Sequence, residues 1–142
     1  NNPIDEVLVD DLDALLAINL RAPFLVSQAV GRVMKRNGYG RIVNIASIWS
    51  VITRERRSAY TTTKAGLAGM TKTVAVDLAP HGILVNAVAP SIMDTPANRA
   101  AIPDGDYDRW PKVEQVAETI GYLAGPANAL TSGALVPVYG QV

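Results

Sequence analysis

Tyr60 and Lys64 are the first residues whose types and spacing could do chemistry. In the stretch "SAYTTTKAG", residues 58–66, they stand four positions apart, and residues four apart share one face of a helix. A phenol has an ordinary pKa of about 10, and a cation one turn away favours the phenolate and moves that pKa toward neutrality. The pair could therefore act as a general acid and base. The same spacing also fits a half-buried tyrosine beside a solvated lysine.

Two neighbouring features favour the chemical interpretation. The segment around the pair is rich in Thr and Gly, which helices disfavour, so close packing or a ligand must hold it in helical form. Ser47 follows a short apolar run, and its hydroxyl could meet the phenol over one substrate oxygen. These features predict a site shared by Ser47, Tyr60 and Lys64.

Asn19 and Pro23 form a second pair of interest. A proline inside a helix has no N–H for the carbonyl four residues earlier, which here belongs to Asn19. The helical ladder should therefore open at Asn19, where the free carbonyl could hold a water. The alternative is that the proline only bends a long helix around the core.

The segment "APSIMDTP" follows a predicted strand and presents the hydroxyls of Ser91 and Thr95. A turn at such a place could hold a ligand that carries an amide, although most such turns are only loops.

Four other features, one histidine, one charged segment and two tryptophans, are weaker candidates for a chemical role. A histidine in a helix-ending turn is ordinary, and a short run of charges is usually a solvated loop, although it could attract a phosphate. The two tryptophans could line a pocket or fill the core. These features are His81, the segment "RERR" at 54–57, Trp49 and Trp110.

Composition limits the classes of function. The 142 residues fit one domain, with 49% apolar and 18% charged residues and no net charge. We therefore expect neither nucleic acid nor a membrane surface as a partner, and small molecules or protein instead. There is no cysteine and one histidine, which argues against a metal site and agrees with a cytoplasmic protein. The sequence also lacks a run of roughly 18 uninterrupted apolar residues.

Helical and strand patterns alternate along the chain. Helices are predicted at 11–36, 58–79 and 112–124, and strands at 42–46, 83–90 and 133–140, with a loop and one short helix at 91–111. This order indicates an α/β fold with a parallel sheet covered by helices on both faces. Ligands bind beyond the carboxyl ends of such strands, which is where Ser47 and the segment 91–95 should lie.

The quoted motifs resemble the short-chain dehydrogenases/reductases, in particular members such as 3-oxoacyl carrier-protein reductases. "INLRAPFLVSQAV" is similar to the helix with the active-site Asn, "GRIVNIASIWS" to the serine strand, and "SAYTTTKAGLAGM" to the Tyr-x-x-x-Lys helix. "PSIMDTP" and "TSGALVPVYG" are similar to the nicotinamide-side turn and the last strand. The resemblance covers nearly the whole chain and implies the carboxyl-terminal part of a doubly wound, Rossmann-type domain.

The resemblance also implies roles for single residues. Tyr60 would exchange a proton with the substrate oxygen, Ser47 would bind that oxygen, and Lys64 would lower the pKa of the phenol and bind the nicotinamide ribose. Asn19 would hold a relay water through its main-chain carbonyl. The cofactor would be NAD or NADP, bound by Tyr60, Lys64 and the turn residues Pro90, Ser91, Ile92 and Thr95. A secondary alcohol and a ketone would be the small-molecule substrates, and the helices at 11–36 and 58–79 would join copies into a homo-oligomer.

Two departures from the family pattern qualify this resemblance. Ser91 stands where the family usually has Gly, and the glycine-rich, phosphate-binding first half has no counterpart in residues 1–142. The chain is therefore interpreted as the catalytic half, with the strand at 42–46 exposed along one edge. Two alternatives follow: a truncated, catalytically silent chain that acts only in assembly, or an epimerase or dehydratase with a similar Tyr-Lys pair.

Overall fold

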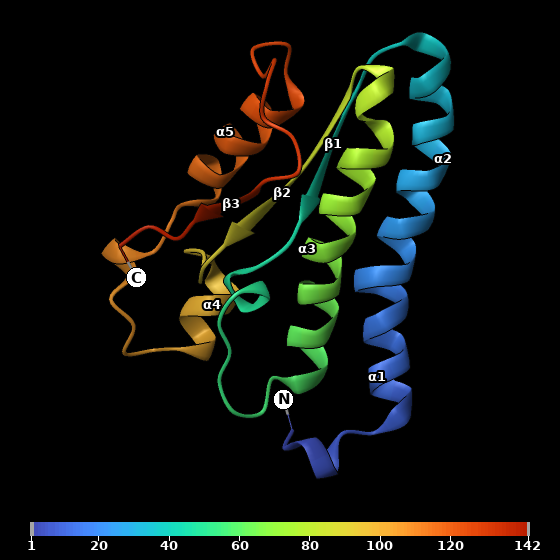
Figure 1. The fold of residues 1–142 in the computed structure, drawn as a ribbon. Coiled ribbons are helices and arrows are strands. Elements are labelled where there is room, and N and C mark those ends of the chain that lie inside the picture. Colours follow the sequence, from blue (N-terminus) through green and yellow to red (C-terminus); the bar gives the residue numbers. More distant parts are fainter. Residues whose placement is uncertain (1, 142) are drawn as a thin grey trace.

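The computed structural model describes residues 2–141, in which helices and parallel strands alternate as predicted (Figure 1). The helices are α1 (Val9–Leu16), α2 (Ala22–Asn37), α3 (Ser58–Leu78), α4 (Pro96–Ala101) and α5 (Val113–Ala124). A π-helical segment, Ala17–Arg21, joins α1 to α2. The strands are β1 (Gly40–Ile45), β2 (Ile83–Pro90) and β3 (Leu135–Val138). Short 3₁₀ turns lie at Ile4–Glu6, Ile48–Ser50, Ala79–His81 and Tyr107–Arg109.

The three strands form a parallel sheet in the order β1-β2-β3. Figure 1 shows α2 and α3 along one face of this sheet and α5 against the other. The predicted α/β architecture is therefore confirmed. In the described part of the chain β1 pairs with β2 alone, and Ile45 at its end is 46% exposed, which agrees with the predicted open edge.

The long amino-terminal helix contains the predicted irregularity. Its ladder widens to a π-helical turn at Ala17–Arg21, immediately before Pro23, which stands in the first turn of α2. A proline without an N–H explains why the ordinary ladder breaks at this point. The helix begins at Val9 rather than at an aspartate, so Asp10 and Asp11 lie in its first turn, where negative charge is favourable.

Other element bounds differ slightly from the predictions. Strand β1 begins two residues before the predicted 42, and β3 is shorter than the predicted 133–140. The 91–111 segment contains α4, as predicted, and also a 3₁₀ turn. Local patterns mark the middle of an element better than its ends, because capping and pairing decide the ends.

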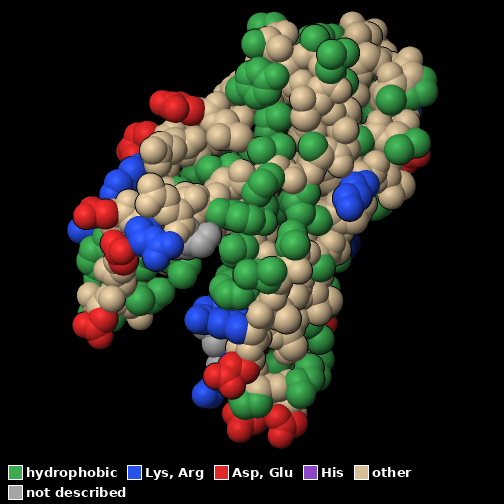
Figure 2. Space-filling view, turned by 60° about the vertical axis from the view of Figure 1, so that its left-hand side comes forward, with side chains coloured by type: hydrophobic (Ala, Val, Ile, Leu, Met, Phe, Trp, Pro, Cys, Tyr) green, Lys and Arg blue, Asp and Glu red, His purple; other side chains and the backbone are tan. Residues whose placement is uncertain are grey.

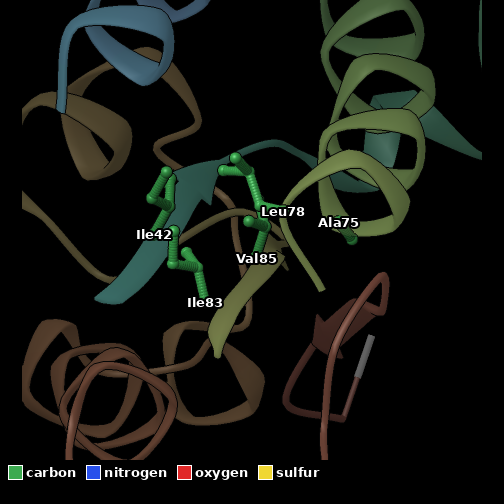
Figure 3. Packing of buried hydrophobic residues seen from close by; sticks show 5 residues of the cluster. All are labelled: Ile42, Ala75, Leu78, Ile83 and Val85. Atoms are coloured by element: carbon green, nitrogen blue, oxygen red, sulfur yellow. The ribbon is translucent and has the colours of Figure 1, made fainter. Parts of the chain in front are cut away.

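A small apolar core joins α3 to strands β1 and β2. Its side chains come from β1, β2 and the carboxyl-terminal half of α3, and they meet between the helix and the sheet (Figure 3): Ile42, Ala75, Leu78, Ile83 and Val85. Next to them, the buried Asn44 amide donates a 2.9 Å hydrogen bond to Thr71 Oγ1. Strand β1 and α3 are thus fixed to each other, which sets the frame for the site.

The continuous helix Val9–Asn37 is long and apolar enough to cross a membrane by length and composition alone. The sequence predicts no membrane span, because no apolar run is uninterrupted over about 18 residues. Isolated polar residues interrupt this helix, but the mean hydropathy of its most apolar 18-residue window is 1.3, which is high enough for a span. Only 11% of its most apolar 18-residue window is buried. Phe24, Val26 and Val33 are among its exposed side chains.

Candidate active site

The carboxyl ends of β1 and β2 lie side by side, since Ile45 pairs with Val88 in the parallel register. Ser47 follows the end of β1 and Ser91 follows the end of β2. The structure therefore brings both segments to one edge of the sheet, as the sequence predicts. Figure 2 shows the surface deeply notched between the part that carries α4 and the part that carries the lower ends of α1 and α3.

Ser47 is 7% exposed and is held in a tight turn. Its Oγ accepts a 3.3 Å hydrogen bond from the Trp49 N–H, and its own N–H donates to Ser50 Oγ at 3.3 Å. Ser50 Oγ in turn donates to the Lys64 carbonyl at 3.0 Å. The serine turn is therefore anchored on the same helix as the Tyr-Lys pair.

Lys64 lies beside Tyr60 and reaches the sheet. Its Nζ is 5.8 Å from the centre of the Tyr60 ring and donates a 2.9 Å hydrogen bond to the Ile45 carbonyl. Partial burial lowers the pKa of Lys64, because desolvation disfavours the ammonium. The cation thus stands between the phenol ring and the end of β1, two residues before Ser47.

Asn19 is connected to Tyr60 through a buried threonine. The Asn19 amide donates to Thr63 Oγ1 at 3.4 Å, and that hydroxyl donates to the Tyr60 carbonyl at 2.8 Å. Thr63 is fully buried. Sequence reasoning missed this threonine, because "TTTK" offers three equivalent hydroxyls and only helix packing selects one of them. A main-chain water on Asn19 stays a prediction.

Hydrogen bonds hold the turn after β2 at both of its ends, Ser91 and Thr95. The Ser91 N–H donates to the Val138 carbonyl at 3.2 Å and its hydroxyl donates to the Tyr139 carbonyl at 2.7 Å. Thr95 Oγ1 accepts a 3.2 Å hydrogen bond from the Asn98 N–H and so caps α4. Ser91, which stands where the resemblance leads one to expect glycine, therefore ties the turn to β3.

Asp94 is a residue of this turn that sequence reasoning missed. Its carboxylate accepts hydrogen bonds from Arg99 at 2.5 and 2.8 Å and from Lys112 at 2.6 Å. These two cations hold the pKa of Asp94 well below its usual range. Lys112 is far away in sequence, so no local spacing could have predicted the cluster. Asp94 joins the turn to α4 and to the start of α5.

A cavity of about 410 Å³ brings two of the predicted residues together, Asn19 and Tyr60. Ser47, Lys64 and the turn after β2 do not line it. Within residues 2–141 no hydrogen bond joins Ser47 Oγ to the Tyr60 hydroxyl. The structure thus places the predicted residues in one region, linked through α3, without closing them into one constellation.

The two tryptophans and the histidine lie in different surroundings. Trp110 is buried and packs edge-on against Tyr107, which makes it a core residue. Trp49 lies near Ser47 and carries the guanidinium groups of Arg54 and Arg57 over its ring at 5.3 and 5.8 Å. His81 is exposed at the end of α3. The described residues contain no cluster that could hold a metal ion.

Comparison with known proteins places this geometry in context. The family model described as short chain dehydrogenase matches residues 1–106. L-xylulose reductase of Bos taurus is 39% identical over 149 residues, which cover 97% of this chain and 61% of that protein. The 3-oxoacyl-(acyl-carrier-protein) reductase of Thermotoga maritima is 34% identical over 139 residues, which cover 92% of this chain and 56% of the reductase.

Solved structures give the same result. A gluconate 5-dehydrogenase from Burkholderia cenocepacia, in complex with NADP and tartrate, superposes with a TM-score of 0.89 at 33% identity over 98% of this chain and 58% of its own. Other structures that superpose well contain NAD+ or NADH. The chain spans about half to three fifths of the length of these proteins. With this family model, these relatives and the parallel sheet in agreement, the chain belongs to the short-chain dehydrogenase family.

Proposed function

We propose that this chain carries the catalytic half of an NAD(P)-dependent oxidoreductase that interconverts a secondary alcohol and a ketone. The observation that supports it most is the arrangement on α3: Lys64 Nζ lies beside the Tyr60 ring at the carboxyl end of β1. Ser47 is anchored to the same helix through Ser50.

The described residues fit the nicotinamide side of such a cofactor. Lys64 offers a partly buried cation at the carboxyl edge of the sheet, where ligands of this architecture bind. The turn at Pro90, Ser91, Ile92 and Thr95 lies at the same edge and is held rigidly by β3 and α4. When bound, the nicotinamide supplies the hydride chemistry.

The chain's own residues would manage the proton and the substrate oxygen. The Tyr60 hydroxyl gives a proton to the ketone oxygen in reduction and takes it back in oxidation. Ser47 Oγ hydrogen-bonds the same oxygen, and the Lys64 ammonium favours the phenolate form. Asn19 holds the turn of α3 at Tyr60 through Thr63; its carbonyl would hold the water that returns the proton.

The test combines binding with a matched tyrosine pair. We expect calorimetry to show that NADH or NADPH binds the folded chain. With NAD⁺ or NADP⁺ supplied as the hydride acceptor, we expect a panel of secondary alcohols to raise the absorbance of the reduced nicotinamide. Tyr60→Phe should lower the rate by about 10²- to 10⁴-fold, whereas Tyr122→Phe, on the exposed face of α5, should leave it unchanged. Cofactor binding without any turnover would favour the assembly-only alternative.

We further propose that the exposed apolar side chains of α1, α2 and α3 pack against a second copy of the chain. A groove of about 630 Å³ runs between α2 and α3 and is lined in part by Leu20, Phe24, Met70 and Val74. Its lining also includes Arg32, Lys35 and Asp77, charges of both signs that suit a self-complementary, two-fold contact. A membrane would meet these charges at an unfavourable cost.

A further inference from the structure

We propose that the substrate carries an oxyanion, a carboxylate or a phosphate, which Arg56 and Arg57 bind at the cavity next to Tyr60. The inference rests on the proposed function, because it takes Tyr60 as the residue that meets the reacting oxygen. It adds a chemical class of substrate to that function, from residues that lie outside the Ser-Tyr-Lys set.

The cavity itself joins the two kinds of residue. Its lining includes Arg56, Arg57 and Tyr60, from the start of α3 and the residues just before it, and Asn19 from the π-helical segment. Apolar side chains complete it: Val7, Ala14, Leu15 and Ile18. A volume of about 410 Å³ suits a small molecule. A ligand there can place a carbon chain against the apolar wall while its two ends meet the phenol and the guanidinium groups.

Arg56 and Arg57 make no ion pair among the described residues. The segment 54–57 contains three arginines and one glutamate, and both ion pairs among the described residues are made by Asp94, far along the chain. Within residues 2–141, therefore, no carboxylate lies within ion-pair distance of Arg56 or Arg57. Guanidinium groups bind carboxylates and phosphates through paired hydrogen bonds.

Three local features favour an anion at this place. The Arg57 guanidinium lies over the Trp49 ring at 5.8 Å, which restricts its orientation. Arg57 is also the N-cap of α3 and gives no side-chain cap, and the first helical hydrogen bond comes from the Thr61 N–H. In addition, Ser58 Oγ is buried without a hydrogen-bond partner among the described residues and belongs to the cavity wall.

Asp11 also lines the cavity, and its carboxylate would repel an oxyanion. The oxyanion should therefore sit on the side of the arginines, away from α1. Removal of this charge provides an independent test, because Asp11→Asn should strengthen binding while a loss of arginine weakens it.

The experiment uses three six-carbon probes that differ in one end group: gluconate, sorbitol 6-phosphate and sorbitol. Each is titrated into the ¹⁵N-labelled chain at constant ionic strength, and the two indole N–H signals are followed by NMR. We expect gluconate or sorbitol 6-phosphate to shift the Trp49 signal in a saturable way, while the signal of the buried Trp110 stays still. Sorbitol should cause no such shift, and the stronger of the two anions identifies carboxylate or phosphate.

Variants assign the effect to residues. Arg57→Gln should weaken anion binding by about 10-fold, as expected for one lost charged hydrogen bond, and Arg56→Gln gives a second reading if Arg57→Gln disturbs the helix start. Asp11→Asn should tighten binding a few-fold. Arg36→Gln, an exposed change at the end of α2, should have no effect.

Three results would overturn the inference: equal shifts with sorbitol, no saturable shift with either anion, or full binding in both arginine variants. None of these depends on nicotinamide or on turnover. A chain that oxidises neutral alcohols but ignores the anions would keep the proposed function and lose this inference. A chain that binds the anions through Arg57 but never binds NADH or NADPH would have the anion site and lose the proposed function.

Discussion

The ammonium of Lys64 donates a 2.9 Å hydrogen bond to the carbonyl of Ile45, at the last residue of β1. The Ala46 N–H already pairs with the Val88 carbonyl, and successive residues of a strand point their backbone groups in opposite directions. The Ile45 carbonyl therefore faces the edge that β2 does not cover. The proposed catalytic lysine thus also supplies a hydrogen-bond donor to an unpaired carbonyl at the exposed edge of β1.

This burial predicts an unusual pH dependence of stability. The pKa of Lys64 is lowered in the folded chain, so the unfolded chain binds more protons between that value and the ordinary lysine pKa of about 10.4. Stability should therefore rise with pH in this window. Because Lys64 is only half-buried, the rise should stay below about 1 kcal/mol.

Urea unfolding from pH 8 to 10.5 checks this sign. The difference in unfolding free energy between the unmodified chain and Lys64→Met should grow with pH, on top of a constant loss from the missing hydrogen bond. Lys72→Met, on an exposed position of α3, should show no such growth. A difference that is flat or falls with pH would contradict the burial of the ammonium.

The hydrogen bond between Asn44 and Thr71 should matter more for folding than for chemistry. Both side chains are buried, at 8% and 1% exposure, and Thr71 Oγ1 is the acceptor for the Asn44 amide. Thr71→Val keeps the shape but leaves that amide without a partner, which should cost about 1–3 kcal/mol in unfolding free energy. Thr73→Val, two residues away and exposed, should stay within about 0.5 kcal/mol. Equal effects would mean that a water replaces the lost hydroxyl.

The Asp94 cluster predicts resistance to acid in the turn after β2. Because Arg99 and Lys112 hold the pKa of Asp94 well below its usual range, its contribution to stability is present above the ordinary aspartate pKa and is lost only in strong acid. Asp94→Asn should lower the thermal midpoint at neutral pH and abolish this acid-dependent part. Asp104→Asn, at an exposed position of the same segment between β2 and α5, is the control. If both variants melt alike at neutral pH, Asp94 does not hold the turn.

Patterns within one element predicted most of this fold. Apolar spacing indicated α3 and β2 nearly to the residue, and the missing N–H of Pro23 predicted the break that the π-helical turn makes at Ala17–Arg21. These features depend on residues that are close in sequence, where backbone chemistry alone decides the outcome.

Contacts between distant segments were beyond such reasoning. The partner of Asp94 at Lys112 and the link from Asn19 to Tyr60 through Thr63 depend on how elements pack, which single-sequence spacing does not contain. The same limit applies to Lys64: its spacing from Tyr60 was readable, but its hydrogen bond to Ile45 required the sheet. The candidate site residues could therefore be proposed from the sequence, whereas the contacts that position them could not.

The exposed apolar helices predict self-association. Phe24 is 51% exposed and lines the groove between α2 and α3, so Phe24→Glu should place a charge in the proposed two-fold contact. Sedimentation should show dimers or larger assemblies for the unmodified chain and a shift of at least about 10-fold toward monomer for Phe24→Glu. Leu130→Glu, at an exposed position outside the groove, should change nothing. A monomeric chain that binds lipid vesicles would instead favour a membrane as the cover of this helix.

Two left-handed glycines at the start of neighbouring strands provide the sharpest stability test. Gly38 precedes β1 and Gly82 precedes β2, with φ of 65° and 71°, so alanine at either position should cost about 1–2 kcal/mol from backbone strain. A Cβ on Gly38 meets nothing within 4 Å, whereas one on Gly82 would lie 2.7 Å from the Gly38 carbonyl oxygen. Gly82→Ala should therefore destabilise the chain clearly more than Gly38→Ala in urea unfolding, because backbone must move to relieve the contact. Equal losses would show that the two turns can separate freely, and that β1 and β2 are aligned by the sheet alone.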